Sequence, residues 1–388
     1  MSWERWLTDT LLKVYLDRVR RITLEEIETI LPRSARGAGG LYDLMRDYPL
    51  RYGKSMRPAI AIAACRAFGG PLEGVAATAA TLELFHNAFL IHDDIEDQSY
   101  LRRDEETLNR KHGVAAAINV GDAMLAATMP PLLGNISRIG LGRSLRILRI
   151  VERMARESAE GQMLELTWIK ENAWDQRDRD YVRLVHKKTG WYSFIAPALA
   201  GAVIAGLSDA DAEGFARAFV CLGIAFQIRD DVLNLAAAPD GYGKDFWGDL
   251  WEGKHTLILI EALRRANRNE RERALGVLAR PHPGVGGLAS ARSKLEDLHA
   301  HGAISEAAYQ ELLRSAFGDG PAPKTQADIV FLRDLVERTG ALDFARKLAV
   351  RHARRARREI GRRLAATPDS EHKGFLLGLG DFAVGRAH

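Results

Sequence analysis

The segment LELFHNAFLIHDDIED, residues 82–97, has the apolar spacing of a helix. Residues four apart lie one above the other in a helix, so Asp93 and Asp97 share a face with Phe89 and His86. Two carboxylates placed in this way repel each other unless a cation lies between them. A face that carries an aromatic ring, an imidazole and two carboxylates is too polar for a core, so we predict that it is the wall of a cavity.

A second acidic helix is predicted at FQIRDDVLN, residues 226–234. Asp230 and Asp231 are flanked there by apolar residues, and Gln227 precedes Asp230 by about one turn on the same side. One D-D-x-x-D motif alone fits a solvated acidic patch equally well, but a second acidic helix favours a shared role. Mg²⁺ binds one or two carboxylates together with substrate phosphates. The two helices therefore predict a diphosphate held through magnesium ions.

The periodicity of the whole chain predicts an all-α fold. Apolar residues recur at intervals of three and four, and no run shows the sustained alternation of strands. With 388 residues, 47% of them hydrophobic, the chain can bury a large core, and we expect a single domain over residues 1–388. Two short helical segments between Gly/Pro-rich turns predict a helical insertion at residues 281–324.

The composition limits the partners and the compartment. Lysine and arginine exceed aspartate and glutamate by 55 to 51 and are spread along the chain, which favours small anionic ligands over nucleic acid. The two cysteines, Cys65 and Cys221, are too few for a disulfide framework and favour a reducing cytoplasm. No uninterrupted apolar run is long enough for a membrane span, so none is expected.

One strongly basic segment, RKLAVRHARRARREIGRR at residues 346–363, could indicate an anionic surface or RNA. A solvated helix face is the favoured interpretation, because an apolar stripe runs through the segment. The stripe consists of Leu348, Ala349, Ala353, Ala356 and Ile360.

Basic side chains also occur where a diphosphate site needs them. Lys54 and Arg57 lie where a helix begins, so its free amides and its dipole would reinforce anion binding. Arg102 and Arg103 follow the first acidic motif closely and can bind phosphate oxygens in a bidentate way. Further lysines stand in HKKTG (186–190) and in residues 242–257. Each cluster taken alone would also fit a solvated surface.

These motifs occur in a fixed order: G-K-x-x-R-P, H-x-x-x-x-x-H-D-D-x-x-D, L-R-R, K-T, F-Q-I-x-D-D and G-K…D-L-x-E-G-K-x-T. From Gly53 to Thr256 they resemble the trans-isoprenyl (polyprenyl) diphosphate synthases, and the closing FLLGLGDFAVGRAH resembles the end of that family. The resemblance implies a helical bundle around a central active-site cavity, and a homodimer. It also implies condensation of isopentenyl diphosphate with dimethylallyl, geranyl or farnesyl diphosphate, with three magnesium ions per site.

The resemblance assigns roles by position. Isopentenyl diphosphate would bind Lys54, Arg57, His86 and Arg103, and the allylic diphosphate would bind Arg102, Lys188, Lys244 and Lys254. Asp93, Asp97 and Asp230 would be the magnesium ligands, while Asp94 and Asp231 would orient ligands and metal-bound waters. Thr189 and Gln227 would turn oxygen dipoles toward the allylic cation.

The chain departs from the family pattern at Asn234 and Glu165, where aspartate is usual. Asn234 keeps an oxygen acceptor, which favours weaker metal affinity over inactivity. The D-D-x-x-N ending resembles geranylgeranyl diphosphate synthases of eukaryotic type. The positions four and five before the first aspartate, which set the floor of the product pocket in this family, hold Phe89 and Ala88. We therefore expect a twenty-carbon product, with farnesyl or geranylfarnesyl diphosphate as alternatives.

Three other classes share part of the pattern. A terpene cyclase would need an N-D-x-x-S-x-x-x-E run, which the sequence lacks. A non-catalytic partner subunit of a synthase would tend to lose its aspartates, and five of the six motif positions keep theirs. A metal-dependent phosphohydrolase built on His92 and Asp93 would need a second His-Asp pair, which is also absent.

Overall fold

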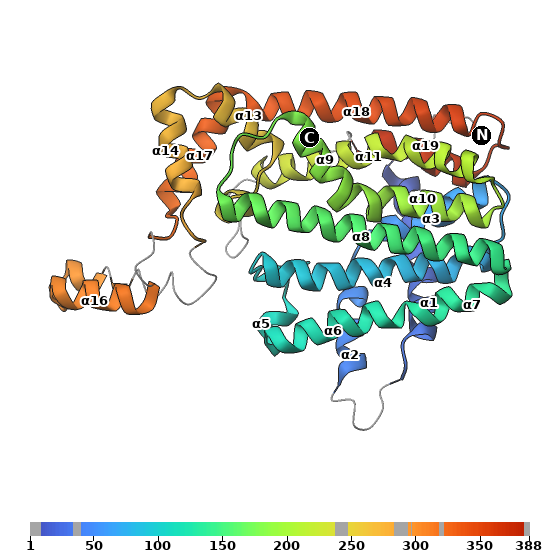
Figure 1. Ribbon diagram of the computed structural model, residues 1–388, viewed down its shortest axis with the longest axis horizontal. Coiled ribbons are helices and arrows are strands. Elements are labelled where there is room, and N and C mark those ends of the chain that lie inside the picture. Colours follow the sequence, from blue (N-terminus) through green and yellow to red (C-terminus); the bar gives the residue numbers. More distant parts are fainter. Residues whose placement is uncertain are drawn as a thin grey trace.

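The computed structural model describes residues 9–33, 40–236, 247–282, 294–295, 297–317 and 322–383. Helices make up almost all of this part of the chain and lie side by side in a bundle (Figure 1). The predicted all-α fold is thus confirmed.

The N-terminal half contains α1 (Asp9–Ile30), α2 (Leu41–Leu50), α3 (Met56–Ala67), α4 (Leu72–Glu96), β1 (Leu101–Arg102), β2 (Glu105–Glu106), α5 (Leu108–His112), α6 (Val114–Ala127), α7 (Met129–Ile139) and α8 (Leu141–Glu171). The C-terminal half contains α9 (Asp178–Val185), the π-helix η2 (His186–Ile195), α10 (Ala196–Ile204), α11 (Asp209–Ala236), α12 (Gly248–Glu252), α13 (Leu257–Arg265), α14 (Arg268–Leu278), α16 (Glu306–Phe317), α17 (Gln326–Thr339), α18 (Ala341–Arg363) and α19 (Glu371–Phe382).

The two acidic helices pass through the middle of the bundle. Nearly every residue of α4 before its acidic end is buried, because its sequence is apolar or small on all sides. Both helices carry their aspartates in the last turns, Asp93 and Asp97 on α4 and Asp230 and Asp231 on α11. Burial of the apolar parts of α4 and α11 therefore fixes the positions of both acidic ends.

Two local features were not predicted from the sequence. One is the hairpin β1–β2, which pairs Leu101 with Glu106 and Arg102 with Glu105. Its two turn residues, Arg103 and Asp104, both have positive φ, as a two-residue type I′ turn requires. The other is η2, which interrupts the α-helical path between α9 and α10. Segments of this kind are rare and often lie at functional sites.

The predicted insertion is only partly described, since residues 283–293, 296 and 318–321 lie outside the described residues. Its second helical segment is α16, which projects from the body of the bundle (Figure 1). The first predicted segment, at 290–302, begins among residues that are not described.

Two helical stretches are long and apolar enough to cross a membrane. One is α4, in which 89% of the relevant window is buried inside the bundle. The other runs from Val114 to Ile139 through α6 and α7, and only 33% of its window is buried. The second stretch therefore presents an apolar outer surface.

Candidate active site

A cavity of about 380 Å³ lies between the acidic ends of α4 and α11. Helix α8, the π-helix η2 and the segment 248–256 complete its wall. Nine of the predicted site residues line this cavity: Asp93, Asp97, Arg102, Lys188, Thr189, Gln227, Asp230, Asp231 and Lys254. Lys244 lies outside the described residues.

The cavity is strongly acidic. Its carboxylates are Asp93, Asp97, Glu165, Asp230, Asp231, Asp249 and Glu252, and its lysines and arginines are Arg102, Lys188 and Lys254. Seven negative and three positive groups leave a formal charge of −4. The negative ends of the α4 and α11 dipoles add to this potential. A site with this charge requires cations before it can hold an anion.

The first and last aspartates of the first motif each face a lysine from a distant part of the chain. Lys188 Nζ lies 3.4 Å from Asp93 Oδ1, and Lys254 Nζ donates to Asp97 Oδ2 at 2.8 Å. Burial opposes ionisation of Asp93, but Lys188, Lys254 and Arg102 together hold its pKa below the usual range. At Asp97, burial outweighs the lysine and raises the pKa to about 7. A divalent cation that bound these aspartates would compete with the two lysines for the carboxylate oxygens.

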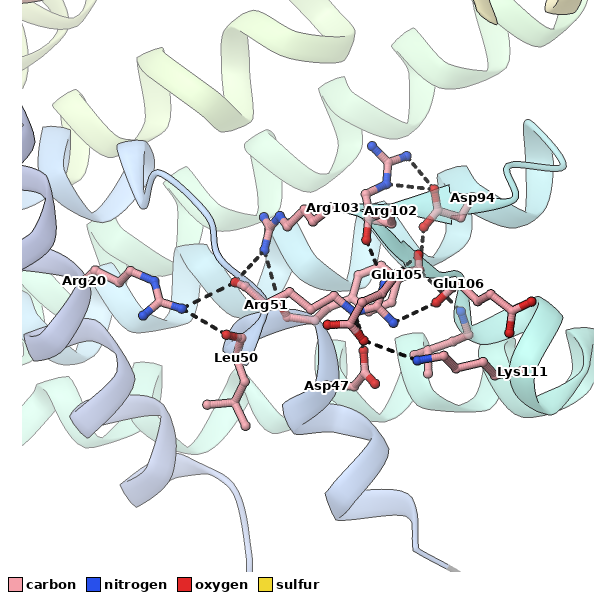
Figure 2. Close-up of polar contacts among 12 residues, drawn as sticks. Arg20, Asp47, Leu50, Arg51, Asp94, Arg102, Arg103, Glu105, Glu106 and Lys111 are labelled. Carbon is pink, nitrogen blue, oxygen red and sulfur yellow. Dashed lines mark hydrogen bonds and ion pairs between the residues drawn. The ribbon is translucent and has the colours of Figure 1, made fainter. Parts of the chain in front are cut away.

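The middle aspartate of this motif, Asp94, points away from the cavity and organises Arg102. Tyr48 donates its hydroxyl proton to Asp94 Oδ2 at 2.5 Å, while both Nε and Nη2 of Arg102 donate to Asp94 Oδ1 (Figure 2). Arg102 then lines the cavity with its guanidinium 3.8 Å from Asp93 Oδ2. Asp94 therefore holds the Arg102 guanidinium in place and does not itself line the cavity.

The hairpin turn sends Arg102 and Arg103 in different directions (Figure 2). Arg103 Nη1 donates to the carbonyl oxygens of Tyr48 and Arg51, and its guanidinium packs over Gly53, where a Cβ would lie 2.8 Å from Cζ. Buried Arg51 fastens the hairpin by donating to the carbonyl oxygens of Arg102 and Glu106, at 2.9 and 2.8 Å. Sequence reasoning missed Arg51, because nothing in its spacing connects it to the motifs.

On the second acidic helix, Asp231 belongs to a chain of hydrogen bonds. Thr189 Oγ1 donates to Gln227 Oε1 at 2.8 Å, and Gln227 Nε2 donates to Asp231 Oδ1 at 2.9 Å. Tyr181 donates its hydroxyl proton to the other oxygen of Asp231 at 2.7 Å. Burial raises the pKa of Asp231 to about 7 despite these donors. Asp230, by contrast, is exposed to the cavity.

Asn234 and Glu165, the two residues that stand where aspartate is usual, each form a hydrogen bond at the site. Asn234 Oδ1 accepts the backbone N–H of Asp249 at 3.3 Å, which ties the end of α11 to α12. Asp249 and Glu252 of α12 line the cavity, although neither was predicted as a site residue. Glu165 accepts a short hydrogen bond from Lys188 Nζ. Glu165 thus holds this lysine beside the first motif.

Lys188 is brought to the site by close packing of α8 against η2. A Cβ built on Gly161 of α8 would lie 2.3 Å from the backbone nitrogen of Lys188 and 2.6 Å from its Cα. Glycine is therefore required at this position by space.

The four residues assigned to isopentenyl diphosphate lie outside the 380 Å³ cavity, in a group of their own. The Arg57 guanidinium stacks over Tyr192 at 4.5 Å and donates to Ser193 Oγ at 2.7 Å. His86 stacks on the same tyrosine ring, with 5.8 Å between centroids. Burial, together with Arg57 and Arg103, lowers the pKa of His86 well below its ordinary value, so its imidazole is neutral. Tyr192 lines the cavity and connects it to this group.

Lys54 Nζ lies 5.6 Å from the centre of the Phe382 ring on the C-terminal helix α19. Its charge also acts on the second acidic helix, because burial raises the pKa of Asp230 and Lys54 opposes that rise.

A smaller cavity of about 190 Å³ opens beside Asp93, between α4 and α8. Phe89 forms part of its wall and packs edge-on against Tyr192, with 5.8 Å between centroids. Ala88 lies on another face of α4, fully buried in the cluster that includes Val120 and Met124 of α6. Ala88 consequently lines neither of these two cavities, and only Phe89 faces the smaller one.

The donor set fits a hard cation that takes oxygen ligands, such as Mg²⁺. Within the part of the chain that the structure describes, no three His, Cys, Asp or Glu side chains converge closely enough to chelate a metal by themselves. A magnesium ion here would bridge carboxylates to the phosphate oxygens of a ligand and to water, as this ion usually does.

Comparisons with known proteins bear on the family and the fold. The family model for polyprenyl synthetase matches residues 40–292. A short chain isoprenyl diphosphate synthase of Methanothermobacter thermautotrophicus is 29% identical over 337 residues, which are 87% of either chain.

Two solved structures share the fold over nearly their whole length. A geranylgeranyl pyrophosphate synthetase of Pyrococcus horikoshii superposes with a TM-score of 0.76 at 26% identity, covering 97% of this chain and 99% of its own. A polyprenyl synthase of Caulobacter crescentus, solved with calcium and isoprenyl diphosphate, has a TM-score of 0.72 at 26% identity and covers 100% and 98%.

Proposed function

The chain belongs to the polyprenyl synthetase family, and we propose that its product is geranylgeranyl diphosphate. As a member of this family it is a magnesium-dependent prenyltransferase that condenses isopentenyl diphosphate with an allylic diphosphate to a short-chain trans-prenyl diphosphate. The product length, the number of metal ions, the residue roles and the oligomeric state described below are proposals.

The single observation that carries the prenyl-transfer chemistry is the acidic cavity between the two aspartate helices. Once metal binding has ionised all seven carboxylates, the formal charge of the lining is −4, and two divalent ions would only neutralise it. Three ions would make the lining net positive, which suits an anionic diphosphate, so we propose three. Asp93, Asp97 and Asp230 would hold them, since all three face the cavity from opposite helices. When bound, the ions supply charge stabilisation for the departing diphosphate.

The protein's own cations complete the diphosphate site. Arg102, Lys188 and Lys254 already lie beside the first-motif aspartates, so they need move little to contact phosphate oxygens. As the allylic C–O bond breaks, the electron pair leaves with the diphosphate and a carbocation remains. The double bond of isopentenyl diphosphate attacks this cation and forms the new C–C bond. The positive charge now lies on the former isopentenyl unit. This unit loses a C–H proton to the departed diphosphate and forms a new double bond, so no protein nucleophile is needed.

The second substrate would occupy the group around Tyr192. Arg57, Arg103 and Lys54 supply positive charge there, and neutral His86 can donate one hydrogen bond. Tyr192 separates this group from the cavity, so its ring lies between the two diphosphates. Thr189 and Gln227 lie on the cavity side of the tyrosine, where their oxygens would face the cation.

The twenty-carbon length rests on the smaller cavity. Phe89 closes it one helical turn below Asp93, and Phe85 lies edge-on behind it with 6.0 Å between ring centroids. An aromatic at this depth supports a floor, and the family likeness of the D-D-x-x-N ending supports four isoprene units.

We also propose that two copies associate through α6, α7 and α8. More than half of the exposed large hydrophobic side chains among the described residues lie on these three helices: Val114, Ile118, Met129, Leu133, Ile136, Leu141, Leu145 and Met163. Exposed apolar surface of this extent usually marks an interface. The exposed side chain of Asp122 within α6 favours a protein partner over lipid. A cytoplasmic location stays a prediction.

Incubation with Mg²⁺, labelled isopentenyl diphosphate and, separately, dimethylallyl, geranyl and farnesyl diphosphate tests the activity and the length together. We expect magnesium-dependent elongation to twenty carbons, lost in Asp93→Ala. A fifteen- or twenty-five-carbon product would refute the length alone. Absence of elongation from a folded protein would favour a non-catalytic partner subunit.

Light scattering on Leu133→Asp tests the dimer, with Val330→Asp as the control because Val330 is exposed on distant α17. We expect a monomer for the first variant and a dimer for the second. Dimers in both would exclude this face.

A further inference from the structure

Helix α18 concentrates positive charge on the outside of the bundle. It contains nine arginine and lysine residues and only two acidic ones, Asp343 and Glu359. Its formal charge is therefore +7, and since the whole chain carries +4, everything else sums to −3. All nine basic residues are exposed.

Six of them share one narrow face. At 3.6 residues per turn, they fall within an arc of roughly 100° and extend over about 22 Å of helix. We call them the α18 stripe: Lys347, Arg351, Arg354, Arg355, Arg358 and Arg362. The buried stripe centred on Ala353, Ala356 and Ile360 points in nearly the opposite direction, into the core against α11. Packing therefore holds the α18 stripe outward in a straight row.

The charge of the stripe is hardly compensated. Basic residues on its flanks have acidic partners, with Arg346 bound to Asp343 and Arg357 bound to Asp381. Within the stripe, only Arg362 has an ion pair to a described residue, Glu359 at 2.9 Å. Five neighbouring cations therefore repel one another, and this repulsion would be relieved by an extended anionic partner.

The shape of the surface decides between partners. Helix α18 forms one edge of the molecule, with α6 and α7 at the opposite edge (Figure 1). Because α11, α13, α17 and α19 all pack against it, α18 cannot enter a groove of a duplex. The stripe also contains no aromatic side chain on which single-stranded bases could stack. A flat row of cations without aromatic rings fits a plane of phosphate headgroups better than RNA.

We propose that the α18 stripe is a docking surface for anionic phospholipid membranes. The enzyme would bind at the bilayer surface, without insertion, through α18 lying parallel to it. The part of the proposed dimer face on α6 and α7 stays clear of the lipid in this orientation. The inference rests on the surface charge and holds for any product length.

Sedimentation with vesicles tests the proposal. Wild-type protein is mixed with vesicles of phosphatidylcholine alone or with one third phosphatidylglycerol, at low and at high salt. The stripe variant combines Arg351→Gln, Arg354→Gln and Arg358→Gln. The matched control removes the same charge from exposed positions elsewhere, with Arg179→Gln, Arg268→Gln and Arg314→Gln.

We expect wild type to bind only the anionic vesicles and to dissociate as salt screens the charges. Each basic residue near an anionic surface contributes about fivefold in affinity, so the stripe variant should bind roughly a hundredfold more weakly. The control should bind like wild type, and prenyl transfer without vesicles should be equal in all three proteins. An equal loss in the control, no vesicle binding by wild type, or tighter binding to a single-stranded RNA oligonucleotide would overturn the proposal.

Discussion

Replacing Phe89 with alanine should lengthen the product by one isoprene unit. The substitution removes six ring carbons from the wall of the 190 Å³ cavity. The next ring behind it is Phe85, four residues earlier on α4, which is about 6 Å deeper at 1.5 Å per residue. An isoprene unit adds four chain bonds of about 1.5 Å, or about 5 Å when extended. The new space therefore accommodates one unit and not two.

The assay compares chain lengths from farnesyl diphosphate and excess isopentenyl diphosphate by chromatography. Phe344→Ala is the control, because Phe344 is also half-buried but packs in the cluster around α13 and α17. Neither ring is fully buried, so each variant should lose less than the ~3–5 kcal/mol of a buried phenylalanine. An unchanged product length in a folded Phe89→Ala protein would refute the floor assignment. The same lengthening in Phe344→Ala would show that the effect is not local.

Three further predictions concern the site and its support. Gly161→Ala should cost ~1–3 kcal/mol by overpacking α8 against η2 and should reduce turnover, whereas Gly142→Ala, which has open space on the same helix, should cost nothing in denaturant unfolding. Burial lowers the pKa of His255 to about 4, so the unfolded chain binds a proton as the pH falls below 6.5 while the folded chain does not. Wild type should lose about 3 kcal/mol more unfolding free energy than His255→Phe between pH 7 and pH 4 in EDTA; equal losses would contradict a buried neutral imidazole. Asp94→Asn should release Arg102 and lower kcat/KM for the allylic diphosphate by ten- to a hundredfold, as expected for a charged hydrogen bond. If KM for isopentenyl diphosphate also rose ten- to a hundredfold, the substitution would have distorted the whole site and not only released Arg102.

The sequence predicted those parts of the fold that depend on local periodicity. The spacing around Asp93 and Asp230 required two helices with acidic ends, and the structure has them at the centre of the bundle. The β1–β2 hairpin escaped prediction because its turn uses Arg103 and Asp104 at positive φ, without the glycine that usually marks such a turn. The π-helix was not predicted, because one extra residue within a helix does not change the amino-acid composition in a recognisable way.

For the site, local motifs located the charged residues but not their supports. Tyr48, Tyr181 and Arg51 contact the motifs only through folding, from positions about fifty residues away in sequence. Asp249 begins the D-L-x-E-G-K-x-T motif, and its spacing before Lys254 was a usable signal. The direction of Ala88 could have been read from helical geometry, because it lies on the opposite side of α4 from Asp97. Its assignment to the floor came from family likeness and not from its position on the helix.

The π-helix between α9 and α10 makes this part of the chain sensitive to length as well as to identity. A deletion of one residue from His186–Ile195 would remove the extra residue and let α9 and α10 join as one ordinary α-helix. The flanking helices would keep their phase, but residues inside the segment would turn by up to about 100°, so Thr189 would lose its alignment with Gln227. A substitution here alters single contacts, whereas the loss of one residue moves Lys188 and Thr189 together away from their partners. Relatives that function should therefore keep the residue count of this helix, even where side chains that do not line the cavity differ.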